Sequence, residues 1–492
     1  MKLLAFDYGA SSGRAILGDF DGERLSLREL HRFPNDPVQL ADGLYWDILR
    51  LFHEMMQGIS KAALAAGTEL SSIGIDTWGV DVGLLDKDGR LLANPYHYRN
   101  SAEATMNKVF ELIPGNVIYE RTGIQLQPFN TLFQLFSLKT GNPDLLDRAS
   151  AMLFIPDLLR YFLTGEKTCE YTIASTSQMI GPKDSGWDKY LLEKLGIPLE
   201  ILTNIVDAGE MAGRLTERVA GELGTGRVPL VAVAEHDTGS AVISVPAGEG
   251  PYAYISSGTW SLLGVESEEP IINDLSFSLN YTNEGGYNRS TRLLKNIMGL
   301  WIFQECKREW EKEGAALSFD DLVNMAYASE PFLAFIDPDD ITFFSPGGMP
   351  RKIREYCKKT GQKIPGSKGQ VVRCIMESLA LKYRMAVESL EEIVGYKIPV
   401  LHVVGGGSKN KMLNQFTANA TARPVITGPA EATAIGNLIV QLMALKEIKS
   451  LDEGRTLVKR SETLAEFMPQ ESDQWEEAYD RFIKVVSAKK ND

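Results

Sequence analysis

The spacing of apolar and polar positions predicts an antiparallel meander at the start of the chain. Leu3–Phe6 is an apolar run, a turn of small residues follows it, and Ala15–Gly18 is apolar again. Asp21-Gly22 is a hairpin signal before a further short run at residues 24–27. From Trp46 to about Ala65, apolar residues recur every three or four positions, which predicts a helix. The chain is therefore expected to open with paired strands and then a helix.

Strand and helix patterns alternate afterwards, as is typical of an α/β protein. Ser72–Val82 is predicted to be a strand that runs into Trp78-Gly79, and residues 102–165 are rich in helix patterns. Val228–Ala234 is predicted to be a buried strand. A helix is expected from about Asn296, and it would carry Asn296, Trp301 and Gln304.

The pattern of strand, small-residue turn and strand at the start of the chain recurs about half a chain later, at residues 252–265. Val400–Val404 then enters Gly405-Gly406-Gly407 before a helix expected from about Lys411. This recurrence predicts an internal duplication, with Pro246–Pro251 as the hinge. The expected architecture is two α/β lobes, residues 1–245 and 246–492, with a cleft between them.

Composition narrows the class of protein. The 492 residues are 44% hydrophobic and 24% charged, which is ordinary for a globular protein and excludes disordered and fibrous classes. Lys and Arg number 51 against 65 Asp and Glu, a net charge of −14, so the chain lacks the basic field that favours nucleic acid or anionic membrane. No apolar run reaches the roughly 20 residues of a membrane span, and Asp7 interrupts the first run too early for a signal peptide. We therefore expect a cytoplasmic protein with neither nucleic-acid nor membrane partners.

The four cysteines and five histidines do not indicate a zinc site. No CxxC pair occurs, and no two histidines lie three to five residues apart. So few cysteines in so long a chain fit a reducing compartment, where Cys357 and Cys374 would remain thiols even as neighbours.

Three small-residue turns are candidates for binding phosphate or nucleotide. In Asp7-Tyr-Gly-Ala-Ser-Ser-Gly-Arg14, backbone N–H groups can approach an anion closely, and the preceding carboxylate can hold a hydrated Mg²⁺. Ser257-Gly258-Thr259 repeats the device, and Gly405-Gly406-Gly407 allows a close approach to a flat nucleoside. A plain glycine-rich hairpin explains the first turn equally simply, and the chain contains no GxxxxGK[ST] motif.

Two further segments lie where strands end, which is where open α/β sheets place their ligands. In His236-Asp237-Thr238, Asp237 is a candidate general base for phosphoryl transfer, and a helix N-cap is an equally good interpretation of it. In Trp78-Gly79, the indole could pack on a sugar and the glycine could make room for its hydroxyls, or Trp78 could be an ordinary core residue.

Taken in order, these segments resemble those of the FGGY carbohydrate kinases. The segments that carry the resemblance are Asp7–Arg14, Ile75–Asp81, His236–Thr238, Ser256–Trp260 and Val404–Ser408. The resemblance runs from about Lys2 to about Leu442 and implies two actin-like, ribonuclease H-like lobes with a nucleotide- and sugar-binding cleft between them. Pro128–Leu132, Glu170–Thr172, Ala174–Thr176, Thr282–Gly286 and Leu294–Trp301 are similar to the members of the family that phosphorylate L-rhamnulose.

The resemblance also implies roles for individual residues. Asp237 would accept the proton of the ketose C1 hydroxyl, and Asp7 would hold the water shell of Mg²⁺. The expected sugar contacts are Gly79, His236, Asp237, Thr238 and Asn296. The expected ATP contacts are Ala10, Ser11, Ser12, Gly13, Arg14, Thr259, Gln304, Gly405 and Gly406. Many members of the family that this chain resembles carry an aspartate and an arginine in the stretch that here reads Tyr98–Glu103. Arg99 is present, but Asn100 and Ala102 depart from the pattern and leave the sugar contacts of that loop open.

The reaction implied by the resemblance is transfer of phosphate from ATP to a small-molecule ketose, L-rhamnulose. Another sugar or polyol, such as L-fuculose, xylulose or glycerol, is an alternative substrate. An actin-like ATPase scaffold without a sugar pocket is an alternative of a different class, against which the Trp78-Gly79 and His236-Asp237 pairs argue. A catalytically silent sugar sensor would not need Asp7 and Asp237.

Overall fold

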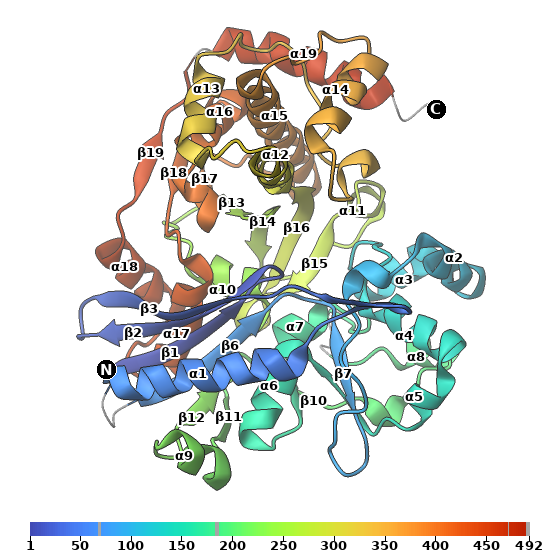
Figure 1. The fold of residues 1–492 in the computed structure, drawn as a ribbon, viewed down its shortest axis with the longest axis vertical. Helices are drawn as coiled ribbons and strands as arrows, with labels where there is room; N and C mark the ends of the chain where they lie inside the picture. The colour runs from blue at the N-terminus through green and yellow to red at the C-terminus, as the bar shows by residue number, and fades with distance from the viewer. Residues whose placement is uncertain (67–69, 183–185, 471, 489–492) are drawn as a thin grey trace. The chain divides into compact units, whose positions relative to one another are not determined.

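The computed structural model describes residues 1–66, 70–182, 186–470 and 472–488. The chain forms two compact units, each built on a mixed sheet with helices (Figure 1). The first unit consists of Met1–Pro246, Glu266–Leu294 and Ala432–Glu462, and the second of Ala247–Val265, Lys295–Glu431 and Thr463–Asp492. The predicted α/β class is confirmed. The proposed division of the chain into residues 1–245 and 246–492 remains a prediction. The two compact units are each assembled from three segments that alternate along the chain.

The first unit is built on a sheet with the strand order β11-β12-β6-β1-β2-β3. Strands β1 and β6 are parallel, whereas β2 pairs antiparallel with both β1 and β3. The strands are β1 (Lys2–Tyr8), β2 (Ser12–Phe20), β3 (Leu25–Pro34), β6 (Leu70–Thr77), β11 (Met211–Arg214) and β12 (Pro229–Val231).

Alternation along β1 buries both faces of this sheet. Leu4 and Phe6 belong to a core with residues of helix α1 (Ile48–Ala66), whereas Leu3 and Ala5 belong to a core with residues of helix α17 (Ala432–Ala444). Successive side chains of a strand point to opposite faces, so one helix covers each side. Both faces of β1 are therefore buried, and its polar residue Asp7 lies near the carboxyl end of the strand.

Smaller elements surround this sheet. The β4–β5 hairpin, the antiparallel pair β7–β8 and the parallel pair β9–β10 lie outside it, and β15 pairs antiparallel with the start of β16. These strands are β4 (Val38–Leu40), β5 (Gly43–Tyr45), β7 (Val82–Leu85), β8 (Ala151–Phe154), β9 (Thr168–Glu170), β10 (Asn204–Val206), β15 (Thr282–Gly285) and β16 (Thr291–Met298). The remaining helices of this unit are α2 (Glu103–Leu112), α3 (Gly115–Thr122), α4 (Thr131–Gly141), α5 (Pro143–Asp147), α6 (Ile155–Thr164), α7 (Tyr171–Ser175), α8 (Lys189–Lys194), α9 (Glu217–Leu223), α10 (Asp237–Ile243), α11 (Asp274–Ser278) and α18 (Leu451–Ser461).

The second unit repeats the pairing pattern of the first. Strand β13 pairs antiparallel with β14 across a tight turn and parallel with β17, as β1 does with β2 and β6. Its strands are β13 (Ala253–Ser257), β14 (Trp260–Ser267), β17 (Leu401–Val404), β18 (Val425–Thr427) and β19 (Ala465–Phe467). Its helices are α12 (Trp301–Lys312), α13 (Phe319–Tyr327), α14 (Met349–Lys359), α15 (Lys368–Val394), α16 (Lys411–Thr421) and α19 (Ser472–Ala488). The repeated pairing agrees with the internal duplication inferred from the sequence.

Two element predictions need correction. Asn296 lies on strand β16, and the helix that carries Trp301 and Gln304 starts only at Trp301, because Gly299 and Leu300 separate the two elements. The strand predicted at Val228–Ala234 is reduced to Pro229–Val231, since only its start pairs with neighbouring strands. Within the part of the chain that the structure describes, no helix is both long and apolar enough to cross a membrane.

Candidate active site

Three neighbouring strands of the first unit place Arg14, Asp7 and Asp76 in one row. Asp7 on β1 lies opposite Arg14 on β2 and opposite Asp76 on β6. Residues directly opposite one another on paired strands share a face of the sheet, so the three side chains gather on one side. Arg14 forms an ion pair with Asp7. The row is thus a charged group at the carboxyl ends of β1 and β6.

Asp76 is the buried member of this row. Its Oδ2 accepts a hydrogen bond of 2.6 Å from Nδ2 of Asn437, whose Oδ1 accepts one of 2.7 Å from Nε2 of Gln441. Burial raises the pKa of Asp76 well above its ordinary value, and the neighbouring charges of Asp7 and Asp237 raise it further. Oδ1 of Asp76 has no hydrogen-bond partner among the described residues. Helix α17 therefore fixes this carboxyl group beside Asp7.

The donor set of this row suits a hydrated magnesium ion. Mg²⁺ prefers oxygen ligands and commonly keeps several waters, so one or two carboxylates suffice on the protein side. Asp7 offers a carboxylate at a strand end, and the buried Oδ1 of Asp76 lacks a partner among the residues described. No cluster of three or more His, Cys, Asp or Glu side chains suited to a metal occurs in the described ranges.

The predicted phosphate turn between β1 and β2 is braced by its own backbone and by Asn35. The Gly9 N–H donates to Ser12 O at 2.9 Å, and Asn35 donates from its backbone to Ser11 O and from Nδ2 to Gly9 O. Ala10 and Ser11 are exposed at the tip. Packing requires a glycine at position 13, because a Cβ there would lie 2.3 Å from the ring of Phe33. This packing explains why residue 13 is a glycine, and the contact of Ala10, Ser11, Ser12, Gly13 and Arg14 with phosphate stays a prediction.

His236, Asp237 and Thr238 lie together at the start of α10. Helix α10 begins at Asp237 with His236 as the N-cap residue, so Asp237 does not cap this helix. Oδ1 of Asp237 accepts from Thr238 N at 2.6 Å and from Thr238 Oγ1 at 3.2 Å, and Nε2 of His236 lies 3.4 Å away. The Asp237 side chain is 32% exposed, and its Oδ2 makes no hydrogen bond with any described residue. One oxygen is engaged and the other is available, as a general base requires.

A buried polar network holds the backbone that precedes this base. Glu170 accepts from Glu235 N at 3.1 Å, and Oγ1 of Thr172 accepts from His236 N at 3.2 Å. Glu235 is paired with Arg160 at 2.9 Å. Burial, followed by the nearby charge of Glu235, raises the pKa of Glu170 to about 8. Such a fully buried network fixes the strand end that delivers Asp237.

Glu284 and Arg292 lie beside His236, and the sequence assigned them no role. They are opposite each other on β15 and β16, with Arg292 NH2 3.2 Å from Glu284 Oε2. Arg292 NH2 also lies 3.0 Å from Nδ1 of His236. The sequence does contain a signal for this pair, because Glu284 and Arg292 carry opposite charges on either side of the turn that begins at Gly285-Gly286.

The turn that contains Gly79 is strained. Val80 has φ +67°, which is unfavourable for a β-branched residue. Thr176 and Thr131 hold it: Thr176 Oγ1 accepts from Val80 N at 3.1 Å, and Thr131 Oγ1 donates to Val80 O at 2.6 Å. A Cβ on Gly79 would lie 3.1 Å from Thr176. Strain maintained by surrounding hydrogen bonds is typical of functional sites.

Trp78 is a core residue, so its proposed stacking on sugar is not supported. It is 6% exposed, its ring centroid lies 4.1 Å from that of Trp46, and its Nε1 donates to Asp81 Oδ2 at 2.9 Å. Trp46 Nε1 donates to the same oxygen at 2.6 Å, and Gln134 Nε2 donates to Oδ1 at 3.0 Å. Burial raises the pKa of Asp81 to about 7, although these donors oppose the rise. Both oxygens of Asp81 are thus engaged in structure.

Asn100, which departs from the family pattern, has a structural partner. Its Oδ1 accepts from Leu44 N at 2.8 Å, and its Nδ2 donates to Leu44 O at 2.7 Å. The side chain therefore ties its loop to the β4–β5 hairpin. Arg99 lies with its guanidinium 5.9 Å from the ring centre of Tyr98.

In the second unit, the structure brings Thr259 and Gln304 together. Thr259 Oγ1 lies 3.4 Å from Gln304 Oε1. Trp301 N donates to Thr259 O at 3.1 Å, and Leu300 N donates to Gly258 O at 3.1 Å. The turn between β13 and β14 is therefore joined to the start of α12.

The three consecutive glycines of the second unit differ in what a side chain at each position would meet. A Cβ on Gly407 would lie 2.0 Å from Ser257 Oγ, and one on Gly405 would lie 3.1 Å from Ser257 O. Gly405 also has φ +82°. A Cβ on Gly406 would meet no atom within 4 Å. Packing against the β13 turn explains Gly405 and Gly407, whereas Gly406 faces open space and is the better candidate for contact with a ligand.

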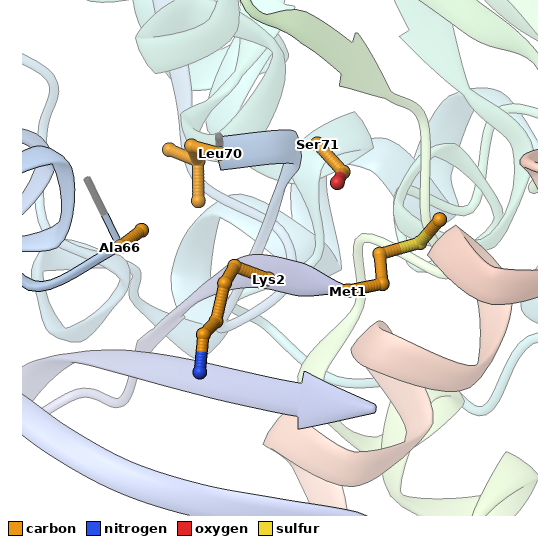
Figure 2. Close-up of a pocket in the computed structure, with 5 residues that line it drawn as sticks. All are labelled: Met1, Lys2, Ala66, Leu70 and Ser71. Carbon is orange, nitrogen blue, oxygen red and sulfur yellow. The ribbon is translucent and has the colours of Figure 1, made fainter. Parts of the chain in front are cut away.

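The predicted site residues therefore form two sets. Asp7, the Ala10–Arg14 turn, Gly79 and His236–Thr238 belong to the first unit. Asn296, Thr259, Gln304, Gly405 and Gly406 belong to the second unit. A surface hollow of about 420 Å³ lies apart from the first set (Figure 2). Met1, Lys2, Ala66, Leu70 and Ser71 line it, at the opposite ends of β1 and β6 from Asp7 and Asp76.

Comparison with known proteins decides the family. Residues 2–244 match the N-terminal domain of the FGGY family of carbohydrate kinases, and residues 253–445 match its C-terminal domain. The chain belongs to this family. It is 46% identical over 486 residues to a rhamnulokinase of Bacteroides thetaiotaomicron, covering 99% of both chains. It is 40% identical to a rhamnulokinase of Bacillus subtilis, covering 96% of both chains.

Solved structures share the fold of this family member at low sequence identity. A xylulose kinase from Lactobacillus acidophilus matches with a TM-score of 0.82 at 16% identity, covering 99% of this chain and 98% of the other. A Plasmodium falciparum glycerol kinase with ADP matches with a TM-score of 0.79 at 17% identity over the same shares. These matches bear out the two-lobed α/β fold expected from the resemblance.

Proposed function

We propose that the enzyme transfers the terminal phosphoryl group of ATP to the C1 hydroxyl of L-rhamnulose, giving ADP and L-rhamnulose 1-phosphate. The observation that carries this proposal is the 40–46% identity, along almost the whole chain, to proteins named rhamnulokinase. Membership of a carbohydrate kinase family supports the reaction class, and the relatives' name supports the choice of ketose.

In this proposal Asp237 is the general base. Oδ2 accepts the proton of the C1 hydroxyl as that oxygen attacks the phosphorus atom, while Thr238 holds Oδ1 through its N–H at 2.6 Å. His236, Thr238, Gly79 and Asn296 would orient the sugar. Phosphoryl transfer leaves the protein mainly positioning and charge stabilisation to supply.

The predicted nucleotide contacts fall in each of the two units. Ala10, Ser11, Ser12, Gly13 and Arg14 would contact the phosphates through backbone N–H groups and the guanidinium. Thr259, Gln304, Gly405 and Gly406 would contact the rest of the nucleotide. Mg²⁺, held through its water shell by Asp7 beside Asp76, would neutralise charge on the phosphate oxygens.

The substrate is tested by ADP release across a panel of ketoses and polyols. We expect L-rhamnulose to give the highest kcat/KM, ahead of L-fuculose, xylulose and glycerol. ATP turnover that is indifferent to every sugar would instead identify an ATPase scaffold. Preference for another member of the panel would keep the kinase class and reject the substrate.

The nucleotide contacts are tested by Gly406→Val. Because a Cβ at this position meets nothing in the chain, the fold should tolerate the substitution, while the KM for ATP should rise roughly tenfold, equivalent to about 1.4 kcal/mol of binding. Gly226→Val is the matched control, since a Cβ there also meets no atom within 4 Å and this glycine is not among the predicted nucleotide or sugar contacts. An unchanged KM for ATP in the Gly406 variant would remove this glycine from the nucleotide site.

A further inference from the structure

His236 links Asp237 to a second pair of buried charges. Its Nε2 lies 3.4 Å from Asp237 Oδ1, and its Nδ1 lies 3.0 Å from Arg292 NH2 and 3.3 Å from Glu284 Oε2. Arg292 is 0% exposed and Glu284 6% exposed. All four residues belong to the first unit.

The arginine decides which ring nitrogen of His236 carries the proton. A guanidinium has only donors, so the 3.0 Å contact requires a lone pair on Nδ1. Glu284 Oε2, although 3.3 Å from Nδ1, makes no hydrogen bond to any described residue. A neutral ring with its lone pair on Nδ1 carries its proton on Nε2, and that N–H faces Asp237.

The arginine is itself held in place. Its Nε donates to Gly285 O at 2.8 Å, and Glu284 lies directly across the β15–β16 pair. Glu284 balances the charge of Arg292, which could not otherwise remain buried without a large penalty. The backbone of His236 is fixed separately by Thr172. The ring therefore has a defined position and a defined tautomer.

This arrangement has a consequence for the base. Oδ1 of Asp237 faces three donors, namely the N–H and hydroxyl of Thr238 and the Nε2–H of His236. With Oδ1 so occupied, the basic lone pairs lie on Oδ2. Contacts that are long in the absence of substrate shorten when the reacting groups are bound, and the 3.4 Å contact is of that length.

We propose that Arg292 and Glu284 are positioning residues for the general base: they fix His236 in its Nε2–H tautomer, and that N–H orients Asp237 so that Oδ2 receives the proton of the sugar hydroxyl. The positioning role rests on the proposed function, whereas the tautomer is a property of the ring that no substrate is needed to measure.

The tautomer is tested by ¹⁵N NMR of histidine-labelled enzyme, with the five histidines assigned through a His236→Gln variant. We expect the ¹⁵N chemical shift of Nδ1 to be that of an unprotonated ring nitrogen, and the shift of Nε2 to be that of a protonated one. In Arg292→Met this preference should be lost, and in Arg292→Lys, which keeps a donor, it should be largely restored. A wild-type ring protonated at Nδ1, or at both nitrogens, would overturn the proposal whatever the activity.

Kinetics test the positioning role. We expect Arg292→Met to lower kcat for the ketose roughly 10- to 100-fold, a partial loss of general-base catalysis, with the KM for ATP within about twofold of wild type. Because the single variant leaves Glu284 buried without its partner, the double variant Glu284→Gln/Arg292→Met is measured beside it, and folding is checked by circular dichroism. Either folded variant retaining the wild-type kcat would overturn the role.

Two controls separate this proposal from the proposed function. Arg289→Met removes an arginine from the same β15–β16 connection that contacts Asp207 and the ring of Tyr171, and it should change neither the tautomer nor kcat. Asp237→Asn should abolish most activity yet leave the lone pair on Nδ1. A wild-type enzyme that phosphorylates no ketose would overturn the proposed function and the positioning role together, while the NMR result would still decide the tautomer.

Discussion

Asp81 and Asp237 both follow strands of the first unit, yet the fold treats the two carboxylates in opposite ways. Asp81 is 1% exposed, and indole and amide N–H groups engage both of its oxygens. Asp237 is 32% exposed in its side chain and has donors on Oδ1 alone. The first carboxylate fastens Trp46 and Trp78 into the core, while the second keeps one oxygen available for chemistry.

The difference shows what distinguishes a structural carboxylate from a catalytic one. Both residues follow a strand and both stand near aromatic or histidine side chains, so residue type and spacing do not separate them. What separates them is how the hydrogen-bond donors are distributed over the two carboxylate oxygens. A base must keep an oxygen that accepts no hydrogen bond from the protein. Both oxygens of the buried Asp81 accept hydrogen bonds, whereas Oδ2 of Asp237 accepts none from the described residues.

The largest effect is expected from Asp237→Asn. The amide can still accept from Thr238 N but cannot take a proton, so kcat should fall roughly 10²- to 10⁴-fold while the KM for ATP barely changes. Steady-state kinetics and urea unfolding of the same preparation measure both properties. A near-normal kcat would remove Asp237 from the catalytic role and erase the contrast with Asp81.

The elements around these two residues were largely predictable from the sequence. The periodicity of the first 66 residues gave the β1–β2–β3 meander and helix α1, because local spacing determines which side of a strand or helix is apolar. The same logic failed at Asn296, where apolar and polar positions within a short segment fit a helix as well as a strand. Pairing of β16 with a partner strand, which the spacing of apolar and polar positions does not reveal, decided the outcome there.

The candidate site was only partly predictable for the same reason. Glycine turns and strand-end carboxylates identified Asp7, Gly406 and Asp237 as candidates. Glu284, Arg292 and Asp76 were missed because their roles come from partners far away in sequence, such as the 361-residue separation between Asp76 and Asn437. Of the two interpretations that the sequence left open for Trp78, packing on a sugar or an ordinary core residue, its burial against Trp46 supports the second.

The second effect in size is expected from Asp81→Asn, and it should fall on stability. An asparagine would turn an N–H group toward either the two indoles or Gln134, leaving buried donors facing one another. We expect a loss of about 1–3 kcal/mol in the free energy of unfolding, the usual cost of an unsatisfied buried polar group. At a temperature where the variant is folded, kcat should stay within a few-fold of wild type. A loss of kcat as large as that of Asp237→Asn would make Asp81 part of the chemistry.

The cost of Asp81→Asn should also depend on pH. The folded state holds the Asp81 proton up to a pKa of about 7, whereas the unfolded chain releases it near the ordinary value of 3.8. The stabilisation due to this proton is therefore fully present below pH 3.8 and is lost as pH rises towards 7, by up to about 1.4 kcal/mol per pH unit.

Asparagine does not titrate, so the difference in unfolding free energy between wild type and Asp81→Asn should shrink from pH 5 to 7 and level off above about pH 8. Urea unfolding at four pH values measures this difference. A difference that stays constant from pH 5 to 8 would mean that Asp81 is ionised throughout this range and is held by its donors as a carboxylate.

The smallest effect is expected at Val80, which lies between the Gly79 turn and Asp81. Its φ of +67° costs a β-branched residue about 1–2 kcal/mol, and Val80→Gly relieves this strain. The substitution also makes the unfolded backbone more flexible, which costs roughly 0.5–1 kcal/mol, and it removes a half-buried side chain. We therefore expect a change within about 1 kcal/mol of zero. Val82→Gly is the matched control, because Val82 is 8% exposed on strand β7 and should lose about 2–4 kcal/mol with no strain to relieve. Equal losses at the two positions would mean that the turn stores no strain.

If the strained turn serves to hold Gly79 against the sugar, the Val80 variant should raise the KM for the ketose and leave the KM for ATP unchanged. That result would assign the turn a role in sugar binding, whereas Asp81 beside it serves to hold the core together.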